Sequence, residues 1–351
     1  MNLIIPISGQ SSRYPNVRPK FLLCHPLHNY MIVEALRGLN LKKFDNIIII
    51  GLKEHEKKYK CFQSIKKEFI LNYGKDFNVR IALLKKRTKN QAETVYRGLQ
   101  LYKDLQGGIL IKDCDNYFEL GDFSGDSNFV ATGDLNKLGK INASNKSYVN
   151  IGKDNTIVNI IEKEVIGNKF CCGGYYFADV NEYKKYYLQL QHHKDLYISH
   201  IIYNMILNGH LFFNEESKNY IDWGTMEDWT AYTRTFGTVF VDLDGTLVKS
   251  SGRWIKPTWG NTEAIKKNVE HINKLYDTNR FHIIITTART ESAREITKKQ
   301  LKKFGVKYHR LITDLPHAKR IIINDYSDTN PYPVSIAVNL RRNSDELEGL
   351  F

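Results

Sequence analysis

The chain has 351 residues, of which 42% are hydrophobic and 25% are charged, and its formal net charge at pH 7 is +13. This composition excludes a disordered or fibrous protein, and the length exceeds what one hydrophobic core usually holds, so we expect two domains. No apolar run approaches the ~20 residues of a membrane helix, and the N-terminal stretch lacks the basic flank of a signal peptide, so we expect a cytoplasmic protein with no membrane partner.

Strands and helices alternate along the first half of the chain. In chain order the apolar and helical patterns predict strand 3–7, helix 30–39, strand 46–50, helix 54–70, strand 79–84, helix 91–103 and strand 108–113. Alternation of this kind implies a mostly parallel sheet wrapped by helices.

Shorter strands follow after Gly-, Ser- and Asn-rich turns. Strands at 129–134, 147–152 and 156–163 suit a smaller mixed-sheet region that covers a substrate, and a helix at 197–209 ends at a glycine. The helical pattern stops near residue 236 and a new strand begins, so we place one domain at 1–235 and a second at 236–351.

The basic residues are spread over both halves of the chain. Their densest run, from Arg294 to Arg310, fits a solvated helix face, so we expect anionic metabolites and no nucleic acid as partners. The five cysteines show neither CxxC spacing nor a nearby paired histidine, which predicts reduced thiols and no zinc site.

A phosphate-binding loop is expected directly after the first strand. Residues 9–13, Gly-Gln-Ser-Ser-Arg, can turn backbone N–H groups toward a triphosphate, and Arg13 and Lys20 supply the positive charge that a leaving pyrophosphate needs. Asp115 follows the strand at 108–113, and Asp222 lies far downstream, so two separate segments offer carboxylates to Mg²⁺. Together these features indicate nucleotidyl transfer. Asp113 stays open between a metal ligand and a strand-end cap.

These motifs resemble the sugar-phosphate nucleotidylyltransferase family over nearly all of residues 1–230. The loop at 7–14 and the Pro19-Lys20 pair match the family's Gly-rich loop and Pro-Lys pair, with Ser11 in place of the second glycine. The resemblance implies phosphate contacts from Gly9, Ser11, Ser12, Arg13 and Lys20, Mg²⁺ held by Asp115 and Asp222, Gln91 beside the base, Lys163 on the acceptor phosphate and Gly174 facing the sugar.

The implied reaction is in-line attack by a sugar or polyol phosphate on the α-phosphorus of a nucleoside triphosphate, with pyrophosphate leaving and no covalent protein intermediate. Ala92 follows Gln91 where the family often has a Gly-containing turn, which leaves the base open. Because relatives with atypical loops include users of CTP, the resemblance favours CTP over UTP, GTP and dTTP.

A second motif, Asp242-Leu243-Asp244-Gly245-Thr246, ends the strand that opens the second domain. It resembles the haloacid-dehalogenase (HAD) phosphatase superfamily, and two further motifs follow in the required order: Thr287 after strand 282–286, and Asp325 after strand 320–323. The resemblance covers about residues 237–345 and implies a HAD-like fold. The short interval between Asp244 and Thr287 predicts no large cap.

The HAD resemblance implies a role for each acidic residue. Asp242 would be the nucleophile that forms an aspartyl-phosphate, and Asp244 would protonate the leaving oxygen and then activate water. Thr287 would bind the phosphoryl oxygen, and Mg²⁺ would be held by Asp242, Asp325 and the backbone carbonyl of Asp244. Lys319 is the nearest candidate for the lysine of the third motif, with Arg320 as its rival. If neither reaches the phosphate, the domain is a weakened phosphatase or a structural remnant.

The sequence thus predicts an α/β protein of two Rossmann-like three-layer domains. The leading hypothesis is a bifunctional enzyme of surface (capsular) polysaccharide precursor synthesis, in which a phosphatase and a nucleotidylyltransferase act on sugar or polyol phosphates. A bisphosphate dephosphorylated before transfer would explain the fusion, and relatives of the first domain often form homo-oligomers. The alternative is a phosphatase whose first domain senses a nucleotide without turnover. The even spread of charge disfavours a structural or nucleic-acid-binding role.

Overall fold

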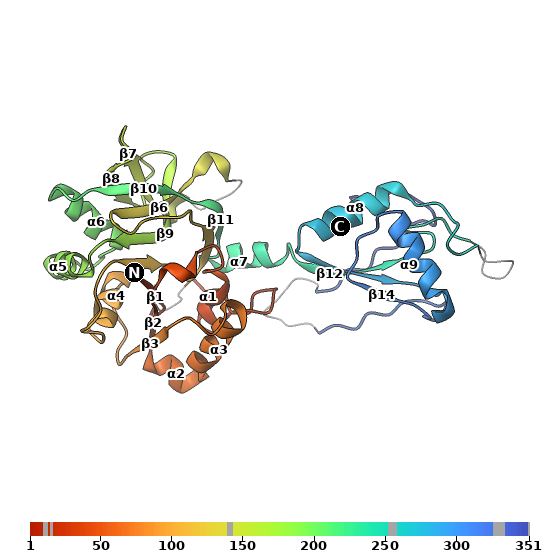
Figure 1. Cartoon of the computed structure of the whole chain (residues 1–351), viewed down its shortest axis with the longest axis horizontal. Helices are drawn as coiled ribbons and strands as arrows, with labels where there is room; N and C mark the ends of the chain where they lie inside the picture. Colours follow the sequence, from red (N-terminus) through yellow and green to blue (C-terminus); the bar gives the residue numbers. More distant parts are fainter. Residues whose placement is uncertain (10–12, 15–16, 139–142, 252–257, 326–333, 350–351) are drawn as a thin grey trace. The chain divides into compact units, whose positions relative to one another are not determined.

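The computed structural model describes residues 1–9, 13–14, 17–138, 143–251, 258–325 and 334–349. Its internal contacts divide the chain into two compact units, Met1–Thr233 and Arg234–Phe351 (Figure 1). None of the described helices combines the length and the apolarity needed to cross a membrane.

The first unit is built on one large sheet with strand order β10-β6-β9-β4-β1-β2-β3. The strands are β1 (Asn2–Pro6), β2 (Asn46–Leu52), β3 (Val79–Leu84), β4 (Ile109–Lys112), β6 (Asn128–Asp134), β9 (Lys169–Phe177) and β10 (Phe212–Glu216), with β7 (Ser147–Ile151) and β8 (Ile157–Glu162) attached beside β9. The β1–β4 region is parallel, as the alternating pattern predicts. β9 runs antiparallel to both β4 and β6.

Helices cover both faces of this sheet. They are α1 (Met31–Glu34), α2 (Lys53–Tyr59), α3 (Cys61–Tyr73), α4 (Gln91–Leu99), α5 (Val180–Leu190), α6 (Ile198–Leu207) and α7 (Met226–Thr233). The fully buried isoleucines of β2 alternate between two cores: Ile48 and Ile50 pack with α4, α5 and α6, whereas Ile47 and Ile49 pack with α1 and α3. A parallel strand buried on both faces needs such a continuous apolar run.

Two predicted helices differ from the structure. The helix expected at 54–70 is interrupted at Lys60, whose φ of 48° is left-handed and ends α2 with a hydrogen bond from its N–H to the Glu56 carbonyl. The Glu56 carboxylate then accepts from Phe62 N–H at 3.1 Å and so caps α3. The helix expected at 30–39 is α-helical only over Met31–Glu34.

A small antiparallel sheet brings distant segments together. β5 (Asn116–Glu119), which follows β4 closely, pairs with β11 (Lys218–Asp222), and Asp222 lies opposite Asn116. Backbone pairing therefore places the predicted downstream carboxylate next to the end of β4.

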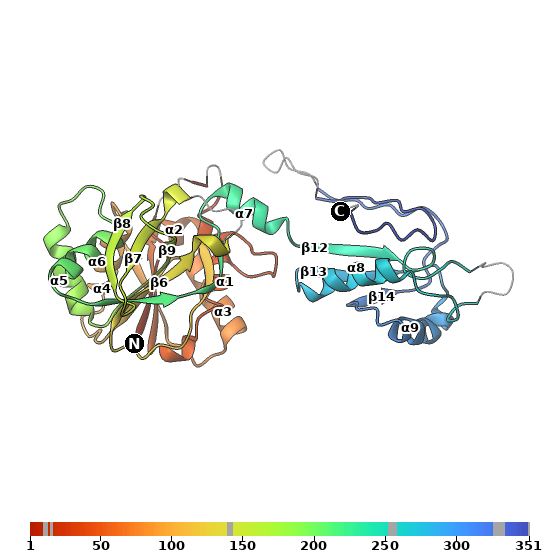
Figure 2. The same cartoon turned by 90° about the horizontal axis from the view of Figure 1, so that it is seen from above.

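The second unit contains the parallel strands β12 (Gly237–Asp242), β13 (Phe281–Thr286) and β14 (Arg310–Ile312), with helices α8 (Lys266–Asp277) and α9 (Arg294–Lys303) (Figure 2). Asp242 lies opposite Thr286, so the ends of β12 and β13 coincide. The apolar faces of these elements share one core, which includes Val241, Ile272, Ile285 and Leu301.

The strand predicted at 320–323 is wrong. The segment has no regular structure, and Ile321, Ile322 and Ile323 are 71%, 55% and 90% exposed. Its apolar residues suit a strand, but the segment does not pair with β12, which pairs only with β13 among the described strands.

Candidate functional site

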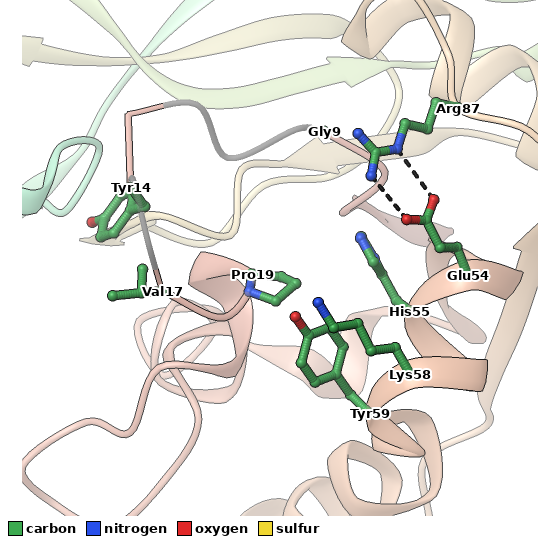
Figure 3. A pocket seen from close by; sticks show the side chains of 9 residues that line it. All are labelled: Gly9, Tyr14, Val17, Pro19, Glu54, His55, Lys58, Tyr59 and Arg87. Carbon is green, nitrogen blue, oxygen red and sulfur yellow. Dashed lines mark hydrogen bonds and ion pairs between the residues drawn. The ribbon is translucent and has the colours of Figure 1, made fainter.

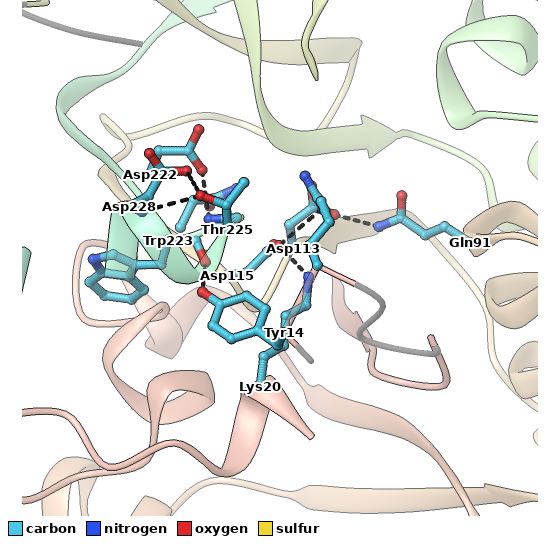
Figure 4. A network of polar contacts seen from close by, with 12 residues as sticks. Tyr14, Lys20, Gln91, Asp113, Asp115, Asp222, Trp223, Thr225 and Asp228 are labelled. Carbon is cyan, nitrogen blue, oxygen red and sulfur yellow. Dashed lines mark hydrogen bonds and ion pairs between the residues drawn. The ribbon is translucent and has the colours of Figure 1, made fainter. Parts of the chain in front are cut away.

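The loop after β1 is anchored at both ends. Ser8, just before Gly9, is buried and its hydroxyl donates to the Ile50 carbonyl at 3.2 Å. Tyr14 is also buried, and its hydroxyl donates to the backbone carbonyl of Trp223 (Figure 4). The loop is therefore tied to the segment that carries Asp222. Two predicted phosphate contacts, Ser11 and Ser12, lie outside the described residues.

Asp115 gathers the two predicted phosphate-binding cations. Lys20, at the start of the 3₁₀ turn Lys20–Leu22, forms an ion pair and hydrogen bond with Asp115, and Arg13 Nη2 lies 3.7 Å from the same oxygen, Oδ2. Burial opposes the charge of Asp115, but the cations outweigh it and hold the pKa of this carboxyl well below its usual range. The ionised carboxylate is thus available to a metal ion.

Asp113 has a different environment from Asp115. Its carboxylate accepts a hydrogen bond from Gln91, and its backbone N–H donates to the Gly173 carbonyl at 2.8 Å. Burial, followed by the neighbouring Asp115 charge, raises the pKa of Asp113 to about 6. Gly173 has a φ of 80°, and a Cβ there would collide with the Asp113 carboxylate. This arrangement favours a structural role for Asp113.

A fully buried lysine shapes the turn that carries Asp115. Lys112, the last residue of β4, donates from Nζ to the backbone oxygens of Asp113 at 2.7 Å and Asn116 at 3.0 Å. Burial lowers the pKa of Lys112 to about 8. The lysine thus fixes the turn between β4 and β5, and with it the position of Asp115.

Asp222 faces the same space as Asp115. The Trp223 N–H donates to the Asp115 carbonyl at 2.9 Å, and the Gly224 N–H donates to Asp222 Oδ1 at 2.9 Å. A Cβ placed on Gly224 would lie 2.9 Å from Asp222 Oδ1 and 3.8 Å from Asp115 Oδ2. The two carboxylates therefore flank Gly224 together, although they come from distant segments.

This donor set fits Mg²⁺. Magnesium is usually held by one or two carboxylates, with substrate phosphates and water completing the shell. Asp115 and Asp222 supply two carboxylates, and Arg13 and Lys20, beside Asp115, are cations that could bind the substrate phosphates. Within the described ranges, no group of three or more His, Cys, Asp or Glu side chains could hold a metal ion.

Lys146 is a site residue that the motifs did not identify. It precedes β7, and its Nζ lies 2.5 Å from Asp222 Oδ2 and 2.5 Å from the Tyr220 hydroxyl. Its side chain is only 12% exposed. No motif marks this lysine, because its partners lie more than seventy residues away and meet it only through the fold.

The predicted acceptor residues lie beside Lys146. The Lys163 N–H donates to the Lys146 carbonyl at 2.9 Å, and Lys163 Nζ lies 4.6 Å above the Tyr197 ring. The adjacent Glu162 carboxylate accepts from the hydroxyls of Ser147 and Ser199. Gly174 lies in β9, where it pairs with Lys112 of β4. A Cβ at this position would collide with the Phe118 ring, so close packing accounts for a glycine here.

In the second unit the structure brings Asp242, Asp244 and Thr287 together at the ends of β12 and β13. Thr287 Oγ1 donates to Asp244 Oδ2 at 3.3 Å. Arg289, which is buried, donates to both Asp244 oxygens. Partial removal from water and the nearby Asp244 charge raise the pKa of Asp242, while Arg320 and His317 partly offset this rise.

Two predicted residues of the second site, Lys319 and Asp325, lie in an exposed segment without regular structure. Asp325 lies in the exposed segment that lacks the expected strand, so it is not carried to the end of a sheet strand. Within the described part of the chain, Asp242, Asp244 and Asp325 form no three-carboxylate cluster, although the implied Mg²⁺ site calls for only two carboxylates and a backbone carbonyl. Lys319 is exposed. Of the two candidate cations, Arg320 is the one whose charge lowers the pKa of Asp242.

Neither a family model nor a curated protein matches this chain. Among solved structures, it is similar to the nucleoside-diphosphate-sugar pyrophosphorylase from Vibrio cholerae RC9, with 19% identity and a TM-score of 0.56 over 66% of this chain and 99% of that chain. It is also similar to a UDP-glucose pyrophosphorylase complexed with UDP-glucose, with 12% identity and a TM-score of 0.51 over 66% of this chain and 98% of that one.

The covered share equals the part of the chain that Met1–Thr233 makes up. At these identities the likeness establishes the fold. The chain therefore shares the fold of these pyrophosphorylases over about two thirds of its length, and the first unit, which makes up the same share, is a mixed α/β architecture with a large, partly parallel sheet.

Proposed function

We propose that Met1–Thr233 transfers a nucleotidyl group from a nucleoside triphosphate to a sugar or polyol phosphate and releases pyrophosphate. The observation that carries this proposal is the meeting of Asp115, Asp222, Arg13 and Lys20 at one point of a unit with the nucleotidyltransferase fold. Simple nucleotide binding does not require the second group of cations, Lys146, which pairs with Asp222, and Lys163, whose N–H donates to the Lys146 carbonyl.

The residues have separate roles in this proposal. Mg²⁺, held by Asp115 and Asp222, would neutralise charge that develops on the transferring phosphate. Arg13 and Lys20 would bind the triphosphate and stabilise the departing pyrophosphate. Lys163 would hold the acceptor phosphate so that an oxygen of this phosphate attacks the α-phosphorus in line. The attack breaks the bond between the α-phosphorus and the oxygen that bridges it to the β-phosphorus, and pyrophosphate leaves. Gln91, held by Asp113, would lie beside the base, and we propose CTP as the donor.

We propose that Arg234–Phe351 hydrolyses a phosphomonoester. Support comes from the meeting of Asp242, Asp244 and Thr287 and from the resemblance of their motifs to HAD phosphatases. In this reaction an Asp242 oxygen attacks phosphorus, the alcohol leaves with a proton from Asp244, and water hydrolyses the aspartyl-phosphate. Because both Asp244 oxygens accept hydrogen bonds from Arg289, Asp244 must first leave Arg289 and take up a proton from solvent before it can protonate the alcohol.

A joint role follows from the two proposals. A cytoplasmic enzyme that first removes one phosphate from a sugar or polyol bisphosphate, and then activates the remaining phosphate as a nucleotide diphosphate, would supply precursors for a surface polysaccharide. The pathway assignment rests on the motif resemblance.

Separate product assays test both proposals. The full chain, with Mg²⁺, nucleoside triphosphates and a pool of sugar and polyol phosphates and bisphosphates, is assayed for pyrophosphate and for inorganic phosphate. We expect Asp115→Ala to lose only pyrophosphate release and Asp242→Asn to lose only phosphate release. If either substitution abolishes both activities, the two-site account fails. If pyrophosphate release is absent from the unsubstituted chain, the first unit either uses an acceptor outside the pool or senses a nucleotide without turnover.

A further inference from the structure

One peptide unit connects the phosphate loop of the first unit to Asp222, one of the two carboxylates proposed to hold Mg²⁺. The carbonyl of this peptide, that of Trp223, accepts a hydrogen bond from the buried Tyr14 hydroxyl (Figure 4). The N–H of the same peptide, that of Gly224, donates to Asp222 Oδ1 at 2.9 Å. Because a peptide unit is planar and rigid, Tyr14 is joined to Asp222 through a single amide.

The hydrogen bonds on the two sides of this amide strengthen each other. A hydroxyl that donates to the carbonyl oxygen polarises the amide and makes its N–H a better donor. The plane of the amide also fixes the direction in which the Gly224 N–H points. The Tyr14 hydroxyl therefore acts on the Asp222 carboxylate through the backbone.

The rest of Trp223 is held by other groups. Its N–H donates to the Asp115 carbonyl at 2.9 Å, and its side chain is only 1% exposed. The indole packs against Trp229 and Tyr232, with ring centroids 5.6 Å and 5.2 Å apart. Among the described residues, however, only Tyr14 donates to the Trp223 carbonyl. The orientation of this carbonyl thus depends on one hydroxyl.

Tyr14 is also part of the phosphate loop. Its ring lines a pocket of about 150 Å³ beside the loop, together with Gly9 (Figure 3). The preceding residue, Arg13, approaches the same peptide, since a Cβ placed on Gly224 would lie 3.4 Å from Arg13 Nη1. A shift of this part of the loop would therefore move the peptide that orients Asp222.

We propose that Tyr14 is a positioning residue for the metal site. Its hydroxyl holds the peptide between Trp223 and Gly224 so that Asp222 is oriented for Mg²⁺, and it thereby couples the phosphate loop to the metal ion. The inference rests on the proposed transferase function, in which Asp222 holds Mg²⁺. Phenylalanine at position 14 would keep the aromatic ring and remove only the donor.

Calorimetric titration of the substrate-free full chain with Mg²⁺ tests the proposal without turnover. We expect Tyr14→Phe to weaken Mg²⁺ binding about fivefold, because Asp222 loses the orientation that one hydrogen bond maintains. Tyr232→Phe is the matched control, since this hydroxyl lies in the same aromatic cluster but is 2.9 Å from His25 Nε2 and does not bond to the Trp223 carbonyl. Its Mg²⁺ affinity should stay within about twofold of that of the unsubstituted chain.

A double-mutant cycle separates orientation of Asp222 from a general loss of stability. If Tyr14 acts through Asp222, Tyr14→Phe should cause no further loss of Mg²⁺ affinity in the Asp222→Asn chain. Any Mg²⁺ that the second unit binds is the same in every variant, so the differences belong to the first unit.

Two kinds of failure can be told apart. Equal Mg²⁺ affinity in Tyr14→Phe and the unsubstituted chain would overturn the role of Tyr14 and leave the metal site intact, as would an equal effect of Tyr14→Phe with and without Asp222→Asn. Mg²⁺ binding that Asp222→Asn leaves unchanged would overturn the proposed metal site itself, and the role of Tyr14 with it.

Discussion

Arg289 holds Asp244 through two hydrogen bonds, from Nε to Oδ2 at 2.9 Å and from Nη2 to Oδ1 at 2.7 Å. The guanidinium also donates from Nη1 to Thr297 at 3.1 Å and to Gln300 at 2.8 Å, so α9 fixes its position. A carboxylate gripped in this bidentate way is rigidly oriented. The pair therefore stabilises the second unit and fixes the orientation of Asp244, the residue proposed as the acid of the hydrolysis.

Arg289→Met should lower the free energy of unfolding of the second unit by about 3 kcal/mol, because it leaves Asp244 without the partner of a largely buried ion pair. Chemical denaturation followed by circular dichroism measures this change. Lys298→Met is the control, since its ion pair with Glu295 is exposed and should contribute less than about 1 kcal/mol. Equal denaturation midpoints for the two variants would show that the Asp244 pair does not stabilise the fold.

Lys146→Met should raise the affinity of the substrate-free protein for Mg²⁺ by roughly fivefold, because the ammonium of Lys146 competes with the metal for Asp222. The same variant should lose transferase activity if the lysine also serves the acceptor side. Magnesium titration by calorimetry gives the affinity. Lys153→Met, in the exposed turn between β7 and β8, should change neither quantity. Unchanged Mg²⁺ affinity in Lys146→Met would show that Asp222 does not bind the metal ion.

Asp113→Asn should stabilise the first unit above pH 6. The folded-state pKa of Asp113 is raised from 3.8 to about 6, so the folded state favours the protonated form, and stability falls as the pH rises from 3.8 through 6. Asparagine avoids this loss, which corresponds to about 3 kcal/mol. Denaturation at pH 4 and pH 7.5 measures it. Asp115→Asn should act in the opposite direction at pH 7.5, because it removes the charge that Lys20 and Arg13 need; a gain for both variants would contradict this assignment.

His25 should make the first unit sensitive to acid. Its ring lies among Trp223, Trp229 and Tyr232, and burial lowers its pKa to about 4. The folded state disfavours the charged ring, so stability is complete above pH 6.5 and falls as the pH drops toward 4. Between pH 7.5 and pH 4.5, His25→Gln should lose about 2 kcal/mol less stability than the unsubstituted chain. If His193→Gln, an exposed control, behaves identically, His25 is not the acid-sensitive group.

Patterns carried by single segments could be predicted from the sequence. Every strand expected before residue 164 forms within two residues of its predicted bounds, because β-branched runs buried on both faces leave few alternatives. The acidic residues at the ends of β4 and β12 could also be placed, because these motifs follow predicted strands directly. The interruption at Lys60 could not be predicted, because a left-handed lysine leaves no clear mark in the sequence.

Features that depend on distant partners could not be predicted. Lys146 reaches Asp222 only because β5 and β11 pair, and Arg289 was visible beside Thr287 but its grip on Asp244 depends on the alignment of β12 and β13. The apolar run Ile321–Ile323 carries a strand pattern, yet its structure depends on whether a neighbouring strand offers an edge. Asp325 consequently follows an exposed segment and not the sheet strand that its motif implies.

Product analysis by mass spectrometry tests the central claim most directly. The full chain is incubated with Mg²⁺, each common nucleoside triphosphate and a pooled library of sugar and polyol phosphates. The account predicts a new nucleotide-diphosphate adduct, formed best with CTP, that disappears in Asp115→Asn. An adduct that persists at the unsubstituted level in Asp115→Asn would contradict the proposed catalytic site, because Asp115 is the carboxylate on which Lys20 and Arg13 converge.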